Sequence, residues 1–371
     1  MIYLDNAATS FPKPKSVITA VEKCIKTYCG NPGRGSHRLS LKASEEIYTA
    51  RENLAKILSI DSPEKIIFTT NATYALNIAI KTTITDKCHV ITSSLEHNSI
   101  IRPLTRLSNI SGLEYSVFSP YGNLKENIIK CIRPDTKAII CTLMSNVTGF
   151  EIPLKELSEI KKEYNLILIV DASQMLGHKK IDLTETPCDV LCGPAHKALF
   201  GIQGCGFCVF CDNKKRDSFI EGGSGTNSKS PFMPEYLPER FEAGTLPTPS
   251  IVALNAGINY IRKFGFEYIE DKISKLTDCF YERILCCGTE IMVGKNGIIS
   301  FSLNDIPSSI IASELDRAKI CVRSGFHCAP WVHRELGSEK FGLTRVSLSL
   351  FNSVKEADKL YLALKEIKNK Y

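Results

Sequence analysis

Short apolar runs alternate with amphipathic stretches along the first two thirds of the chain. Seven runs have the length and composition of buried strands, at residues 65–69, 88–92, 114–118, 137–143, 166–170, 190–192 and 206–211. Helical patterns lie between most of them, at 73–83, 99–107, 124–131 and 154–164. Because buried parallel strands are apolar on both faces, this alternation predicts an α/β fold whose large domain holds a mostly parallel seven-stranded sheet between helices.

The two ends of the chain have different patterns. Residues 1–13 read as an extended arm, and helices are expected from about residue 14 and over 40–58. Beyond residue 250 the pattern predicts long helices at 251–263 and 268–286, short strands near 297–302 and 344–348, and a last helix at 353–369. We therefore expect an arm of residues 1–13 that packs with the small domain, a large domain of residues 14–255 and a smaller α+β C-terminal domain of residues 256–371.

Composition narrows the class of protein. The 371 residues are 43% hydrophobic and 23% charged, and the net charge of +6 is spread along helical faces, so we expect no nucleic-acid partner. No apolar run reaches membrane-spanning length, so we expect no membrane partner either. The first residues lack a charged-then-apolar signal, and the fifteen cysteines therefore favour a reducing cytoplasm over a disulfide framework.

Three of these cysteines, Cys205, Cys208 and Cys211, are spaced by three residues and raise the alternative of a metal site. The segment between them reads instead as a buried strand, in which side chains alternate between two faces. Cys208 would then point away from the other two thiols. We expect no metal site.

Lys197 lies in a loop of small and aromatic residues between two apolar runs. A lysine with so few polar neighbours is partly desolvated, which lowers its pKa and makes the neutral amine available as a nucleophile toward a carbonyl. The alternative is a side chain with a buried stem and a solvated ammonium. The local sequence alone does not decide between them.

Other polar groups follow predicted strands, at the edge of the sheet where α/β proteins place their sites. Thr73 and the free N–H groups of a helix start form an anion site, unless Asn71 or Thr73 simply caps that helix. Asp171 ends an apolar strand and requires a cationic or N–H partner, unless it caps a turn. His97 either stacks on a flat cofactor or moves protons, or it is an ordinary loop histidine.

The C-terminal part adds a thiol and two arginines. Cys328 lies beside His327, near Arg323 and just before a predicted helix start, and each of these features lowers the pKa of a thiol. It is the cysteine that we expect to be reactive. Arg345 stands alone in an apolar strand, where its guanidinium either binds a substrate carboxylate or forms a structural ion pair with an acid of the same domain.

One ligand accounts for Lys197, Asp171 and the anion site together. Pyridoxal 5′-phosphate carries an aldehyde, a pyridine nitrogen and a phosphate. The motifs also resemble, in order, those of the cysteine desulfurase / selenocysteine lyase family, which has PLP-dependent fold type I and belongs to aminotransferase class V. The matching segments span nearly the whole chain and are Tyr-Leu-Asp-Asn-Ala-Ala at 3–8, Phe-Thr-Thr-Asn-Ala-Thr at 68–73, Glu-His-Asn-Ser at 96–99, Ser-Asn-Val-Thr-Gly at 145–149, Asp-Ala-Ser-Gln at 171–174, His-Lys at 196–197, Phe-Glu-Ala-Gly-Thr at 241–245 and Arg-Ser-Gly-Phe-His-Cys-Ala-Pro at 323–330.

The resemblance implies contacts with the cofactor. Lys197 would hold it as a Schiff base, and Asp171 would pair with its pyridine nitrogen. Gln174 would contact the phenolic oxygen, and His97 would stack on the ring. The residues that would contact the phosphate are Ala72, Thr73, His196 and, from the neighbouring subunit of a homodimer, Thr245.

The resemblance also implies the reaction, which takes L-cysteine (or L-selenocysteine) to L-alanine. Cys328 would keep the sulfur as a persulfide and pass it to an acceptor protein or thiol. The residues that would orient the substrate are Asn146, which would also lie against the cofactor, Arg323 and Arg345. The Arg-x-Gly-x-His-Cys-Ala context of Cys328 looks like that of the Suf-type group, which has a short catalytic loop.

Three positions depart from the family pattern. Pro194 and Ala195 stand where a hydroxyl residue and a glycine commonly precede His-Lys, so one phosphate ligand is missing. Thr70 stands where Suf-type relatives often have arginine. The alternatives are a selenocysteine lyase or another lyase for sulfur or selenium amino acids, and a sulfur-carrier or scaffold protein with weak or no PLP activity.

Overall fold

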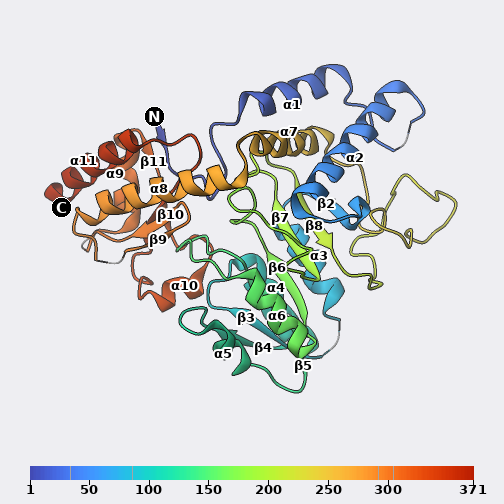
Figure 1. Ribbon diagram of the computed structural model, residues 1–371, viewed down its shortest axis with the longest axis horizontal. Coiled ribbons are helices and arrows are strands. Elements are labelled where there is room, and N and C mark those ends of the chain that lie inside the picture. The colour runs from blue at the N-terminus through green and yellow to red at the C-terminus, as the bar shows by residue number, and fades with distance from the viewer. Residues whose placement is uncertain (34, 86, 291, 304) are drawn as a thin grey trace.

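A seven-stranded sheet forms the centre of the molecule (Figure 1). The computed structural model describes residues 1–33, 35–85, 87–290, 292–303 and 305–371. The strands, in the order β2-β8-β7-β6-β5-β3-β4, are β2 (Ile66–Thr69), β8 (Gly206–Phe210), β7 (Val190–Pro194), β6 (Ile167–Asp171), β5 (Thr136–Thr142), β3 (His89–Ser93) and β4 (Glu114–Phe118). Neighbouring strands are parallel except at β8, which is antiparallel to both β2 and β7. The prediction of a mostly parallel sheet is therefore confirmed.

Helices bury both faces of this sheet. One face packs against a core that includes residues of α1 (Lys15–Thr27), α2 (Arg38–Leu58), α5 (Leu124–Ile129), α6 (Leu154–Tyr164) and α7 (Thr248–Phe264). The other face packs against α3 (Ala72–Thr83) and α4 (Asn98–Ser111). Ile66 and Phe68 of β2 enter the first core, whereas Ile67 enters the second. This double burial explains why inner strands such as β6 and β8 are almost continuously apolar.

The C-terminal elements gather at one end of the molecule, where Figure 1 also places the N-terminus. Their sheet has the order β12 (Arg323–Gly325), β13 (Leu343–Ser347), β10 (Ile298–Phe301) and β9 (Met292–Lys295). The helices of this part are α8 (Phe266–Leu285), α9 (Ser308–Arg317), α10 (Pro330–Glu335) and α11 (Val354–Lys370). A short parallel pair joins β1 (Ile2–Tyr3) to β11 (Ile320–Cys321). A core of its own, distinct from those of the large sheet, holds this part together.

The predicted division into domains remains a prediction, and the structure bears on its boundary. Residue 255 lies inside α7, which packs along its length on α1 and α2. The helix ends at Gly265, where φ is 78°, and α8 begins directly afterwards. A boundary at Gly265 therefore leaves α7 intact with the large sheet.

The cysteines of the β8 region follow the alternation of the strand. Cys205 and Cys211 pack with the core that contains α2, and Cys208 packs with the core that contains α3. The strand interpretation is therefore confirmed. Within the described ranges, no group of three or more His, Cys, Asp or Glu side chains is arranged to hold a metal ion. No helix in the same ranges combines the length and apolarity needed to cross a bilayer.

Candidate active site

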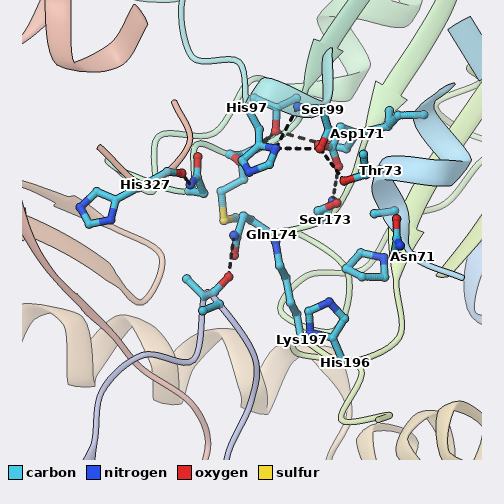
Figure 2. Close-up of a pocket in the computed structure, with 18 of the residues that line it drawn as sticks. Asn71, Thr73, His97, Ser99, Asp171, Ser173, Gln174, His196, Lys197 and His327 are labelled. Atoms are coloured by element: carbon cyan, nitrogen blue, oxygen red, sulfur yellow. Dashed lines mark hydrogen bonds between the residues drawn. The ribbon is translucent and has the colours of Figure 1, made fainter. Parts of the chain in front are cut away.

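A cavity lies where the carboxyl ends of the central strands meet the N-terminal arm and the C-terminal part (Figure 2). It gathers every expected site position except Cys328 and Thr245. Those that line it are Ala72, Thr73, His97, Asn146, Asp171, Gln174, His196, Lys197, Arg323 and Arg345. Positions separated by as many as 273 residues in the sequence are thus brought to one place.

Lys197 follows β7 and borders the cavity, but protein surrounds its ammonium. This desolvation lowers the pKa of Lys197 to about 8, although the negative charge of Asp171 acts in the opposite direction. Arg345 and Arg323 add positive charge that lowers the pKa further. A substantial share of the amine is therefore neutral near neutral pH, as a nucleophile toward a carbonyl requires.

Asp171 is the last residue of β6 and is only 4% exposed. Its Oδ1 accepts the backbone N–H of Ser173 at 2.8 Å, so the turn-capping alternative describes part of what the side chain does. The carboxylate nevertheless lines the cavity, where a cationic N–H of a ligand would find a buried anionic partner.

His97 and Thr73 are linked through a residue that the sequence did not single out. The Nδ1 of His97 accepts the backbone N–H of Ser99 at 3.1 Å and lies 2.8 Å from its hydroxyl, which is 2.7 Å from the hydroxyl of Thr73. Burial lowers the pKa of His97 to about 4, so the ring is neutral. Because Nδ1 accepts an N–H, the ring proton lies on Nε2.

The start of α3 provides a cradle for an anion. Asn71 caps the helix by accepting the N–H of Tyr74 at 2.9 Å, which leaves other first-turn N–H groups free of such a partner. The Nδ1 of His196 is buried and has no partner among the described residues. Burial lowers the pKa of His196 to about 4, so this ring is neutral and can donate one N–H.

Close packing at Gly206 brings the cradle to the edge of the sheet. A Cβ at this position would lie 2.4 Å from the carbonyl carbon of Asn71 and 2.7 Å from the nitrogen of Ala72. β7 extends to Pro194, two residues beyond its predicted end, and Pro194 pairs there with Gly206. The missing hydroxyl at 194 thus coincides with a tightly packed strand end. The remaining groups fit the phosphate, ring nitrogen and aldehyde of pyridoxal phosphate.

Arg345 supplies the cationic wall of the cavity. It is 2% exposed, its Nη2 lies 2.7 Å from the carboxylate of Asp5, and its Nη1 donates to the carbonyl of Asn146 at 3.0 Å. The ion-pair alternative is thus present, but the acid comes from the N-terminal arm. Arg323 of β12 lies opposite Arg345 of β13 in the antiparallel pair. Arg323 forms no ion pair within the described residues.

Cys328 is exposed and does not line the cavity, whereas its neighbour His327 does. The expectation that His327 acidifies the thiol as a cation was wrong. Its ring is buried and hydrogen-bonds through Nε2 to the carbonyl of Leu343, and burial lowers its pKa to about 2. The loop itself is fixed, because Asn146 donates to the His327 carbonyl at 2.8 Å and the N–H of Asn98 donates to the Cys328 carbonyl at 2.7 Å.

Glu96 is a second residue beside the site whose role the sequence did not reveal. Its carboxyl group is fully buried and accepts the N–H of Thr142 and both the N–H and hydroxyl of Ser93. Burial raises its pKa to about 8. It ties the ends of β3 and β5 together immediately before His97. The only signal in the sequence was its place in the Glu-His-Asn-Ser segment.

The chain resembles known proteins over almost its whole length. The aminotransferase class-V family model matches residues 2–360. A probable cysteine desulfurase of Pyrococcus abyssi is 32% identical over 99% of this chain and 94% of its own length. One of Methanothermobacter thermautotrophicus is 30% identical over the same shares. The apo structure of a cysteine desulfurase from Thermococcus onnurineus superposes with a TM-score of 0.92 at 29% identity, covering 100% of this chain and 95% of that one. The chain belongs to the aminotransferase class-V family, in the group that contains the cysteine desulfurases.

Proposed function

We propose that the protein is a pyridoxal-phosphate-dependent cysteine desulfurase. The overall reaction is L-cysteine plus the Cys328 thiol giving L-alanine plus a Cys328 persulfide, in which every atom is balanced. The observation that carries this proposal is the cavity, which brings Lys197 and Asp171 together with an anion cradle and Arg345. The cysteine desulfurase relatives, which match over almost the whole chain, support the same reaction.

Each group of residues has a task in holding the cofactor. The first-turn N–H groups at Ala72 and Thr73, with the His196 ring, would hold the phosphate. Asp171 would pair with the ring nitrogen and favour its protonated form, and His97 would contact the ring. When bound, pyridoxal phosphate supplies an aldehyde for the amine of Lys197 and a ring that accepts electrons from the substrate.

The protein's own groups bind the amino acid and move its protons. Arg345 and Arg323 attract the substrate carboxylate, and Asn146 orients it. Lys197, once its amine is neutral, removes the Cα proton as a general base. The thiolate of Cys328 attacks the sulfur of the substrate, the carbon–sulfur bond breaks, and the sulfur passes to an acceptor protein or thiol.

The first test is to add L-cysteine to the purified protein with bound cofactor and to measure alanine and protein-bound sulfane sulfur. The Cys328→Ala variant should lose both products from L-cysteine, because no thiol remains to accept the sulfur. Cys286→Ala, which removes another exposed cysteine at the end of α8, should keep both. A wild-type protein that takes up the cofactor but forms no alanine would contradict the proposal.

Selenocysteine is the second candidate substrate, and the exposed position of Cys328 outside the cavity favours testing it. Selenium leaves carbon more readily than sulfur, so its release depends less on a thiol. If Cys328→Ala retains activity on L-selenocysteine while losing it on L-cysteine, the protein also acts as a selenocysteine lyase. Loss of both activities would restrict it to thiol-dependent desulfuration.

The site is proposed to be completed by a second copy of the chain in a homodimer. Thr245 is exposed and lies away from the cavity of its own subunit. We assign its hydroxyl to the phosphate of the neighbouring subunit, which would replace a donor that Pro194 lacks. We also propose a cytoplasmic location, because all fifteen cysteines are free thiols, as is usual in a reducing compartment.

A further inference from the structure

The N-terminal segment of residues 5–13 contacts three separate parts of the cavity wall. Ala7 and Ala8 line the cavity themselves. The carbonyl of Ala7 accepts the side-chain N–H of Gln174 at 3.1 Å. Residues 9–13 contact the peptide that precedes Lys197, and Asp5 at the start of the segment contacts Arg345. We call residues 5–13 the N-terminal clamp.

Four donors from the clamp converge on the carbonyl oxygen of His196. They are the N–H of Ser10 at 3.0 Å, its hydroxyl at 3.2 Å, the hydroxyl of Thr9 at 3.1 Å and the ammonium of Lys13 at 3.0 Å. A carbonyl oxygen has two lone pairs, so this number of donors is more than backbone folding requires. The peptide that they fix joins His196 to Lys197.

The ammonium of Lys13 donates to the His196 carbonyl and has no acidic partner among the described residues. Its Nζ also donates to the hydroxyl of Ser10 at 2.8 Å, and within the described part of the chain no carboxylate lies at ion-pair distance. Burial lowers the pKa of Lys13 to about 8, as expected for an ammonium that is held mainly by neutral oxygens. A half-buried lysine without an acidic partner is costly for folding alone.

At the other end of the clamp, Asp5 holds Arg345. Asp5 lies outside the cavity wall and is 21% exposed as a side chain, whereas Arg345 is buried and lines the cavity. The Nε of Arg345 is buried without a partner among the described residues. The 2.7 Å contact with Asp5 and the carbonyl of Asn146 are therefore what fixes the direction of the guanidinium.

We propose that the N-terminal clamp positions both ends of the reacting system, with Lys13 holding the Lys197 loop and Asp5 holding Arg345. The roles of Lys197 and Arg345 rest on the proposed function. Other contacts hold the clamp in place without the side chains of Lys13 and Asp5. Asn6 donates to the carbonyl of Ser347 at 3.0 Å, the N–H of Ala7 donates to its hydroxyl at 2.9 Å, and β1 pairs with β11.

The test of Lys13 uses Lys13→Met, with Lys15→Met as the control, since Lys15 is exposed at the start of α1. We expect Lys13→Met to take up pyridoxal phosphate about tenfold more slowly at fixed pH and to lower kcat about tenfold with KM little changed, because a misplaced Lys197 affects chemistry more than binding. Lys13→Arg should restore most of both rates, since it also donates to the carbonyl.

The test of Asp5 uses Asp5→Asn, with the exposed Asp61→Asn as the control. We expect the KM for L-cysteine and the dissociation constant of L-alanine, measured by titration calorimetry, each to rise about tenfold, with kcat within about twofold of wild type. The two ends of the clamp should thus give opposite kinetic signatures.

Either of two results would overturn the inference. One is a Lys13→Met protein that takes up the cofactor at the wild-type rate. The other is that Lys13→Met and Asp5→Asn both lower kcat and raise KM, each in proportion to its loss of melting temperature. That result would mean that the arm has only a structural role.

If the wild type forms no alanine, the proposed function fails. The rate of cofactor uptake still tests the role of Lys13, and the binding of L-alanine still tests the role of Asp5. A wild type that does not bind L-alanine would overturn the Asp5 half.

Discussion

The reactivity of Lys197 is set by what surrounds one amine. Its pKa near 8 means that about a tenth of the amine is neutral at pH 7, far more than for a solvated lysine with a pKa near 10.4. Only the neutral amine attacks the aldehyde of pyridoxal phosphate. The rate of cofactor uptake by the apo-protein should therefore rise with pH and level off above about pH 8.

Stopped-flow absorbance at constant cofactor concentration measures this rate. His97 and His196, whose pKa values are lowered to about 4, stay neutral across pH 6 to 10 and add no step of their own. A midpoint near pH 10 would instead show that water reaches the ammonium freely.

Single residues also show how far the sequence alone could go. Lys197, Asp171 and Thr73 were predicted as site residues because each follows a predicted strand, where α/β proteins place their binding sites, and all three line the cavity. The pairing of Arg345 with Asp5 was not found, because 340 residues separate the two partners. The buried ring of His327 was missed for the same kind of reason, since its hydrogen bond depends on how β13 packs.

At the scale of elements, the contact between β8 and the start of α3 shapes the anion cradle. Gly206→Ala would place a Cβ 2.4 Å from the backbone of Asn71, and backbone cannot rotate out of the way. The helix start must therefore move. We expect pyridoxal phosphate to bind about tenfold more weakly, and the free energy of unfolding to fall by about 1–3 kcal/mol.

Equilibrium dialysis of the cofactor and urea unfolding of the apo-protein check the two effects. Gly222→Ala is the control, because the nearest atom to its added Cβ would be the Cβ of Ala243 at 3.5 Å. Unchanged cofactor affinity in Gly206→Ala would mean that the cradle does not depend on this contact.

Elements with strong periodicity were predicted well, and weak ones were not. α6 and β4 were predicted with their observed limits, and Pro153 and Asn165 mark the two ends of α6. α9 and β9 were missed, since each is short and gains its stability from the C-terminal sheet. β7 was predicted to end at residue 192, but pairing with β8 carries it to Pro194. Strand ends of this kind depend on a partner strand that local sequence does not show.

At the scale of the whole molecule, the site is assembled from three parts of the chain. The large sheet contributes Lys197 and Asp171, the C-terminal part contributes Arg345, and the N-terminal arm joins them. The pattern of strands and helices was sufficient to predict the fold class. It could not show that the arm lines the cavity, because the arm has no periodicity and its partners, such as Gln174, His196 and Arg345, lie far along the sequence.

Thr245 leads to a prediction about two copies of the chain. If its hydroxyl serves the neighbouring subunit, Thr245→Ala damages the partner's site, whereas Lys197→Ala damages its own. A mixed dimer of the two variants then has one site with both defects and one intact site. Co-expression with two different affinity tags would isolate this dimer.

The mixed dimer should recover about half of the wild-type alanine formation at limiting cofactor, although each parent variant is impaired, because one of its two sites is complete. The control is a mixed dimer of Lys197→Ala with Asp171→Ala, which has one defect in each site and no intact site. Equally low activity in the two mixed dimers would show that Thr245 acts within its own subunit, and a fully active Thr245→Ala parent would show that its hydroxyl serves neither site. A monomeric wild-type protein with full activity would contradict the homodimer directly.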